Sequence, residues 1–182
     1  VKVRAVGICG SELHAFLGTS KRRVPPLVMG HEFAGEVAYI GDGVMSLKVG
    51  DRVAVQPIIG CGVCKACQRG EPNLCVDRKL LGLHTPGAFA EYIAVPEGIC
   101  YAISDELSFE AATFAEPLGN AVRAVAQTPL AMSDSLLVVG VGIIGLLALQ
   151  AAKLRTGGKI IATDVVDAKL DLAKKFGADL VL

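Results

Sequence analysis

The stretch VVGVGIIG, residues 138–145, contains the pattern G-x-G-x-x-G, with glycines at positions 140, 142 and 145. In a chain with 21 glycines, this pattern alone is weak evidence for any function. Here it follows the apolar, strand-like run SLLVV (135–139) and opens the helix-like run IIGLLALQAAKL (143–154). A strand, a glycine-rich turn and a helix in this order are typical of a dinucleotide-binding fold.

Each glycine of this fingerprint has a physical reason. Gly140 allows the tight turn, Gly142 lets the backbone approach a pyrophosphate, and Gly145 lets the helix pack closely on the strand. Asp164 ends the next predicted strand, KIIATD (159–164). We expect its carboxylate to accept hydrogen bonds from the adenosine ribose and to repel a 2′-phosphate, which favours NAD over NADP. The alternative is an aspartate that only caps a turn.

Outward from the fingerprint, the chain divides into two differently patterned parts. The segments DAKLDLAKKFG (167–177) and ADLVL (178–182) read as a helix and a strand, which completes a parallel βαβαβ unit. Four alternating stretches predict strands at 1–6, 35–41, 51–57 and 88–96, and therefore a small irregular barrel or sandwich. Between the two parts, we expect a helical segment over 108–128, interrupted by Pro117. We place the domain boundary between residues 110 and 111.

Composition excludes several classes of partner. Lysine plus arginine and aspartate plus glutamate both number 18, so no net charge attracts nucleic acid or an anionic membrane. Apolar residues make up 52% of the chain, as in a well-packed globular protein. No apolar run reaches the roughly 20 residues that a bilayer requires, and VKVRAVG has no signal-peptide pattern. We therefore expect a cytoplasmic protein with reduced cysteines, no membrane and no nucleic-acid partner.

The densest cysteine cluster is GCGVCKACQRGEPNLC (60–75), which contains four of the six cysteines. Three interpretations compete: disulfides, unligated thiols and a tetrahedral Cys₄ zinc site. Nothing argues for the oxidising compartment that disulfides require, and four unligated thiols at such regular spacing are improbable. We favour a closed Cys₄ zinc site at Cys61, Cys64, Cys67 and Cys75, which stabilises a loop and performs no chemistry.

A sparser set of metal-binding residue types lies in GICGSELH (7–14) and GHEFAGE (30–36). These segments contain Cys9, His14, His31 and Glu32. A cysteine, a histidine and a carboxylate with one open coordination position are what a catalytic zinc requires. The alternative is that these histidines occupy ordinary surface or core sites, and spacing alone does not decide between the two.

Taken in order, CGS-x-x-H, GHE-x-x-G, C-x₂-C-x₂-C-x₇-C, AEP and G-x-G-x-x-G resemble the zinc-dependent medium-chain alcohol dehydrogenases, in particular the sorbitol, threonine and polyol dehydrogenase branch. The resemblance covers essentially the whole chain. It implies a GroES-like β-barrel catalytic domain at 1–110 and the first half of a Rossmann NAD-binding domain at 111–182. It also implies an oxidoreductase that transfers a hydride from a secondary alcohol or polyol to NAD, with one catalytic and one structural zinc.

The resemblance assigns roles to individual residues. Cys9, His31 and Glu32 match the catalytic-zinc positions, and Glu116 in FAEPLGN matches an acidic residue in or beside the same shell. Because adjacent residues cannot easily both face one point in a regular strand, Glu32 or Glu116 is expected to exchange or to lie behind the ligands. The remaining matches are Ser11 and His14 for a proton relay, the four clustered cysteines for the structural zinc, and Gly140, Gly142, Ile143, Ile144, Gly145, Asp164 and Lys169 for the cofactor.

The sequence also departs from the family pattern. Relatives have further β structure before VKVRAVG and further Rossmann strands after residue 182, so we expect a chain truncated at both ends and inactive as given. We expect the full-length protein to be a homo-oligomer. Two alternatives stay open: a threonine-type amino-alcohol dehydrogenase, and a non-catalytic remnant that binds zinc and nucleotide.

Overall fold

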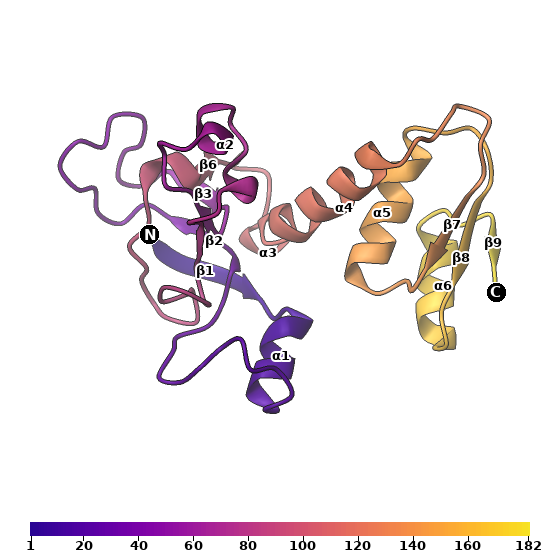
Figure 1. The fold of residues 1–182 in the computed structure, drawn as a ribbon, viewed down its shortest axis with the longest axis horizontal. Coiled ribbons are helices and arrows are strands. Elements are labelled where there is room, and N and C mark those ends of the chain that lie inside the picture. Colours follow the sequence, from indigo (N-terminus) through magenta and orange to yellow (C-terminus); the bar gives the residue numbers. More distant parts are fainter. The chain divides into compact units, whose positions relative to one another are not determined.

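The computed structural model describes residues 1–182, which form two compact units (Figure 1). The first unit is Val1–Glu116 and the second is Pro117–Leu182. None of the helices is both long and apolar enough to cross a bilayer. The domain boundary at residues 110 and 111 stays a prediction.

An antiparallel sheet organises the first unit. Its order is β1 (Lys2–Gly7), β2 (Glu32–Glu36), β3 (Arg52–Val55) and β6 (Cys100–Ala102). The interior contains Phe33, Val53 and Val55, all 3% exposed or less, because these strands turn their β-branched and aromatic side chains inward. A two-stranded sheet, β4 (Ile58–Ile59) with β5 (Lys79–Leu80), lies at the base of the cysteine-rich segment.

Two predicted strands of this unit differ from the structure. The strand predicted at 35–41 begins and ends earlier, as β2, because residues 32–36 pair with both β1 and β3. The segment 88–96 forms no regular strand. The Glu91 carbonyl accepts from the Val3 N–H, the N–H and carbonyl of Ile93 bond to Val1, and the chain bends at residues 88–91. Alternating hydrophobicity could not show where pairing partners end, and Tyr39 and Tyr92, which the predicted strands contain, are exposed.

Short helices of the first unit were not predicted. They are α1 (Gly10–Phe16), α2 (Lys65–Gln68), η1 (Pro72–Leu74) and η2 (Glu97–Ile99). Each is seven residues or fewer, too short for hydrophobic periodicity to register. Helix α1 positions predicted site residues, because it begins directly after Cys9 and ends beyond His14.

The second unit is the predicted parallel βαβαβ arrangement. Strands β7 (Leu136–Val139), β8 (Ile160–Thr163) and β9 (Leu180–Val181) pair in parallel in that order. Helices α5 (Ile143–Lys153) and α6 (Asp167–Lys175) pack against the sheet and against each other (Figure 1). Leu149 on α5 and Ile160 on β8 are fully buried in the core of this unit. On β7, Leu137 and Val139 face solvent.

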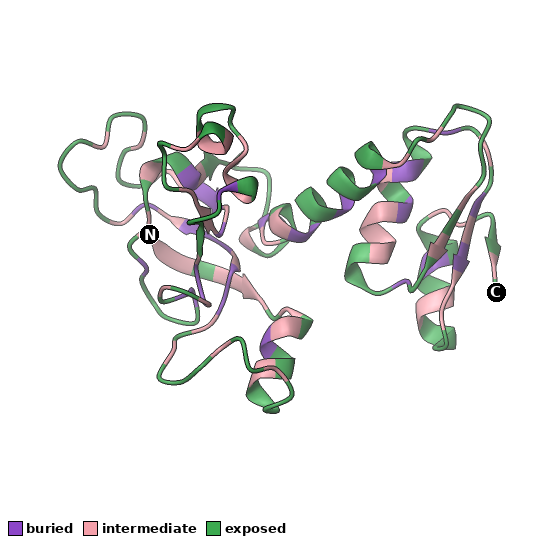
Figure 2. Ribbon diagram, in the orientation of Figure 1, coloured by how far each residue is buried: buried purple, intermediate pink, exposed green.

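The helical segment predicted at 108–128 is present but breaks elsewhere. It forms α3 (Phe109–Ala112) and α4 (Ala115–Gln127), so the interruption falls at residues 113–114. Pro117 lies in the first turn of α4, where its missing N–H would have no intrahelical partner in any case. Only one stripe of α4 is buried, at Pro117, Ala121 and Val125; Glu116 is half-buried and the other residues are exposed (Figure 2).

Candidate functional site

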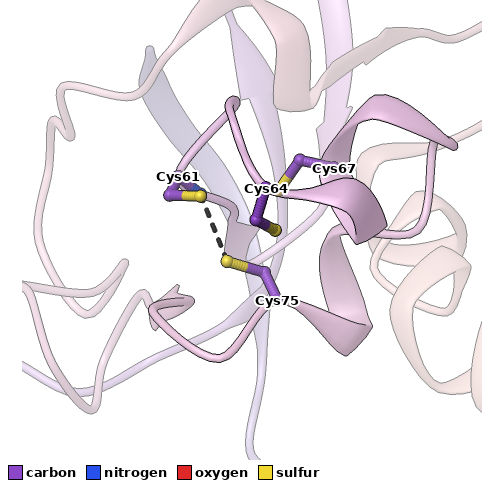
Figure 3. A group of neighbouring side chains, drawn as sticks. All are labelled: Cys61, Cys64, Cys67 and Cys75. Carbon is purple, nitrogen blue, oxygen red and sulfur yellow. Dashed lines mark hydrogen bonds between the residues drawn. The ribbon is translucent and has the colours of Figure 1, made fainter.

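The loop from residue 61 to residue 75 brings four sulfur atoms together. The Sγ atoms of Cys61, Cys64, Cys67 and Cys75 all lie within 4.8 Å of one another and point toward a common centre (Figure 3). Tetrahedral zinc with about 2.3 Å bonds to sulfur requires sulfur–sulfur separations of about 3.8 Å, which is close to this arrangement. All four cysteines are free thiols, and Cys75 is fully buried.

The local chain geometry explains how this group forms. Cys64 precedes the first turn of α2, and η1 leads into Cys75. The N–H of Cys61 donates to the Cys75 sulfur at 3.4 Å (Figure 3). A side chain at residue 60 would press on the Cys67 sulfur at 2.7 Å, so Gly60 is required there.

The ionisation of the thiols in the four-cysteine group favours a bound cation. The N–H groups of Val63 and Cys64 lower the pKa of the Cys61 thiol to about 7. At Cys67 the Gly62 N–H favours the thiolate, but burial and the neighbouring thiols outweigh it and raise the pKa to about 11. Four thiolates so close together repel one another unless a metal neutralises them, so this donor set fits zinc.

A second ligand group lies at the junction of β1, α1 and β2. One ligand atom each from Cys9, His31 and Glu32 lies within 4.8 Å of the other two. Our expectation that adjacent residues would not both face this point does not hold for His31 and Glu32. His31 precedes β2, so strand alternation does not apply to it. The Glu32 carboxylate has room because Gly7, its pairing partner on β1, has no side chain.

Backbone packing fixes the position of His31. Gly30 has φ +98°, and a side chain there would approach the backbone N of Phe89 at 2.7 Å. The N–H groups of Ala88 and Phe89 donate to the carbonyls of Gly30 and Met29 at 2.9 Å. The glycine of the GHE motif therefore permits two backbone segments to lie in direct contact.

Sequence reasoning missed a residue central to this group. Glu12 is 2% exposed, and its carboxylate accepts hydrogen bonds from the N–H of Cys9 at 2.9 Å and the N–H of Gly30 at 2.8 Å. Its Oε1 atom also lies 2.8 Å from His31 Nδ1. The acidic residue three positions after the helix-preceding Cys9 was the available signal, since that spacing is typical of a helix start.

These contacts shift the ionisation of the group. Burial opposes the charge on Glu12, but hydrogen bonds from His31 and Cys9 outweigh it and lower the pKa of the carboxyl. Burial likewise opposes the charged form of His31, yet Cys9 and Glu12 raise its pKa to about 10. The hydrogen bond to His31 in turn lowers the pKa of the Cys9 thiol. An anionic sulfur and carboxylates around one imidazole fit a divalent metal ion.

A second unpredicted residue, Arg23, lies beside this group. Its guanidinium donates to the carbonyls of Gly82 at 2.9 Å and Ser11 at 3.2 Å, and lies 3.4 Å from His31 Nδ1. It therefore joins α1 to the 82–89 segment. No sequence motif distinguished Arg23 from the neighbouring Lys21 and Arg22.

The predicted proton-relay residues lie on α1, and Glu116 lies on α4. Ser11 and His14 are three positions apart on α1, which puts them on one helix face. Thr19 Oγ1 lies 3.0 Å from His14 Nδ1. Glu116 lies in the first turn of α4, and its role as a ligand stays a prediction.

The glycine loop of the second unit has the geometry expected for a dinucleotide. Gly140 has φ +85°, and a side chain at Gly145 would collide with the Gly140 carbonyl oxygen. A side chain at Gly142 would meet nothing within 4 Å, so open space faces the loop there. Asp164 follows β8, and Lys169 Nζ lies 3.4 Å from its Oδ1 atom. These residues fit a bound NAD or NADP.

Comparison with known proteins identifies the family to which this chain belongs. Residues 1–105 match the family model described as the alcohol dehydrogenase GroES-like domain. With the parallel unit that follows, the chain belongs to the zinc-binding medium-chain alcohol dehydrogenase family and is similar to its sorbitol and threonine dehydrogenases.

Particular relatives are similar over the whole chain. A sorbitol dehydrogenase of Bacillus subtilis is 43% identical, and an L-threonine 3-dehydrogenase of Pyrococcus horikoshii is 42% identical, each over 100% of this chain and 53% of the relative. This chain thus spans about half the length of these curated relatives.

Solved structures agree with the fold. A protein of Sinorhizobium meliloti 1021 described as a zinc-binding dehydrogenase, with NADP bound, is 35% identical with a TM-score of 0.92. An alcohol dehydrogenase of Escherichia coli CFT073 complexed with NADH is 38% identical, also with a TM-score of 0.92. Each comparison covers 100% of this chain and 53% of the other.

Proposed function

We propose that this chain is part of a zinc-dependent oxidoreductase that transfers a hydride from a secondary alcohol or polyol to NAD. The observation that carries the proposal is the group of Cys9, His31 and Glu32, whose ligand atoms lie within 4.8 Å of one another. Three protein ligands leave a coordination position for a substrate oxygen, which four cysteines do not. Membership of the family supports the same reaction.

A zinc ion held by this group would lower the pKa of an alcohol in contact with it. The chain's own residues then hold and move the proton. Ser11 lies two residues after Cys9; its hydroxyl accepts the proton of the alcohol while it gives up its own, and His14, on the same face of α1, accepts the proton that leaves the site. Glu116 serves as an exchanging ligand or as a hydrogen-bond acceptor behind the ligands.

The second unit binds the cofactor that accepts the hydride. The N–H groups at the start of α5 bind the pyrophosphate, next to Gly140, Gly142 and Gly145. Ile143 and Ile144 begin this helix and are 52% and 45% exposed, so they are accessible to the cofactor. Asp164 accepts hydrogen bonds from the adenosine ribose, and Lys169 contacts the same ribose. NAD is preferred over NADP because a 2′-phosphate would meet the Asp164 carboxylate.

Amino alcohols are the second candidate substrate class. The 42% identity to an L-threonine 3-dehydrogenase over the whole chain supports it nearly as well as the 43% identity to a sorbitol dehydrogenase supports polyols. A non-catalytic zinc and nucleotide binder is disfavoured, because pure binding has no need of a three-ligand group with an open position.

The test is reduction of NAD by the protein from its complete gene, assayed with a panel of secondary alcohols, polyols and amino alcohols. We expect turnover with one class, and loss of turnover in Cys9→Ser while the four-cysteine metal is retained. A wild-type protein inactive with the whole panel, or a Cys9→Ser variant with full activity, would overturn the proposal.

A further inference from the structure

Asp164 makes more contacts within the protein than a cofactor ligand requires. Its Oδ2 atom accepts a hydrogen bond from the N–H of Val141 at 2.9 Å, and its Oδ1 atom accepts one from the N–H of Val166 at 3.1 Å. The side chain is only 6% exposed. The carboxylate therefore links the end of β8 to the glycine loop after β7.

The partner in that loop is itself buried. Val141, between the first two glycines of the fingerprint, is fully buried. The preceding N–H, that of Gly140, donates to the Thr163 carbonyl at 2.8 Å and ends the β7–β8 ladder. The Val141 N–H is the first amide beyond that ladder, so Asp164 supplies an acceptor that the sheet no longer provides. A buried N–H without an acceptor is costly.

The ionisation of Asp164 supports its contact with the Val141 N–H. Burial opposes ionisation of Asp164, but the N–H groups of Val141 and Val166 and the nearby Lys169 outweigh it and lower the pKa of the carboxyl. The Lys169 ammonium lies 3.4 and 3.5 Å from the two carboxylate oxygens. The carboxylate thus stays charged while it is turned toward the protein.

We propose that Asp164 is a positioning residue for the dinucleotide loop: its carboxylate holds the Val141 N–H, and so the shape of the loop, before any cofactor binds. The contact between Asp164 and Val141 does not depend on the proposed function; only the expected effect on NAD and NADP binding rests on it. If Asp164 shapes the loop as well as contacting the ribose, replacing it by a residue without an acceptor weakens NAD and NADP binding together. It does not convert the protein to NADP.

Two measurements on the protein from its complete gene test this. The first is hydrogen exchange of the Val141 amide by NMR without cofactor, in wild type, Asp164→Ala and Asp164→Asn. The second is the affinity of each protein for NAD and for NADP by calorimetry. Asp167→Asn is the matched control, because it removes a nearby exposed carboxylate at the start of α6.

In Asp164→Ala we expect the Val141 amide to exchange about tenfold faster or more, and affinity for both cofactors to fall about tenfold. In Asp164→Asn the amide oxygen can still accept, so protection of Val141 is retained while discrimination against NADP decreases. Asp167→Asn leaves Val141 exchange unchanged.

Unchanged Val141 exchange in Asp164→Ala, or tighter NADP binding by that variant, would overturn the inference. If Asp164→Ala does not fold, Asp164→Asn decides instead: Val141 protection retained while affinity for both cofactors falls about tenfold would overturn the inference. The two proposals fail separately. Wild type that binds neither cofactor contradicts the proposed function, whereas Val141 exchange still reports on the loop.

Discussion

Replacing Glu12 by alanine perturbs the candidate catalytic group without touching a ligand. The carboxylate accepts from the N–H of Cys9 at 2.9 Å and of Gly30 at 2.8 Å, and lies 2.8 Å from His31 Nδ1. Its side chain is 1% exposed. Alanine leaves all three donors without an acceptor in a space closed to bulk solvent.

The magnitude follows from these three contacts. A buried donor left unpaired costs about 1–3 kcal/mol, and water that enters the space returns part of that cost. We therefore expect Glu12→Ala to lower the free energy of unfolding of the first unit by about 3–5 kcal/mol. Glu12→Gln keeps one acceptor oxygen and should cost about 2 kcal/mol. Zinc affinity of the three-ligand group should fall about 10- to 100-fold in either variant.

Urea unfolding followed by tyrosine fluorescence measures this stability change. All three tyrosines, Tyr39, Tyr92 and Tyr101, lie in the first unit, so their signal reports on that unit alone. Exposed Glu106→Ala is the control and should change stability by less than about 0.5 kcal/mol. If Glu12→Ala unfolds at the same urea concentration as Glu106→Ala, with unchanged zinc affinity, the reasoning is refuted.

Three further predictions concern other parts of the chain. Gly145→Ala should destabilise the second unit by about 2 kcal/mol or more, because its methyl group collides with the Gly140 carbonyl. Gly142→Ala meets open space, so it should keep the fold and lose cofactor affinity; equal loss of helical circular dichroism in both variants would contradict this. The pKa of Asp179 is lowered from 3.8 by the N–H of Ile160 and by Lys153, so its stabilising effect is present above that value and is lost on acidification. Asp179→Asn should therefore reduce the dependence of second-unit stability on pH between about pH 5 and 3, and a variant with the wild-type pH profile would count against it. Cys67→Ser should lower the thermal midpoint of the first unit in zinc but have a much smaller effect with chelator present; equal shifts in both buffers would argue against a structural metal.

The parallel unit could be predicted from sequence element by element. Its strands are continuous apolar runs, its helices have helical periodicity, and the glycines mark the turn between β7 and α5. Each signal is local and each agrees with the final fold. The break in the 108–128 helix was misplaced because Pro117 is compatible with a first helical turn.

The first unit was predicted less well for a physical reason. Its sheet is held by pairings between distant residues, such as β3 with β6, and no local pattern specifies a partner almost fifty residues away. The four-cysteine group was predictable because its ligands lie within one short segment. Cys9, His31 and Glu32 stood out as metal-binding residue types, but their spacing left the role open and only the family resemblance assigned it. Glu12 was missed because an acidic residue on a short helix usually faces solvent.

We infer two separate metal sites in this chain, one closed by four cysteines and one with an open position. Zinc content after dialysis, measured by atomic emission on wild type, Cys9→Ser and Cys67→Ser, tests this inference most directly. We predict two zinc ions per wild-type chain and one in each variant, with Cys9→Ser retaining the thermal stability of a folded cysteine loop. One zinc ion in wild type, unchanged by Cys9→Ser, would contradict a second, open metal site.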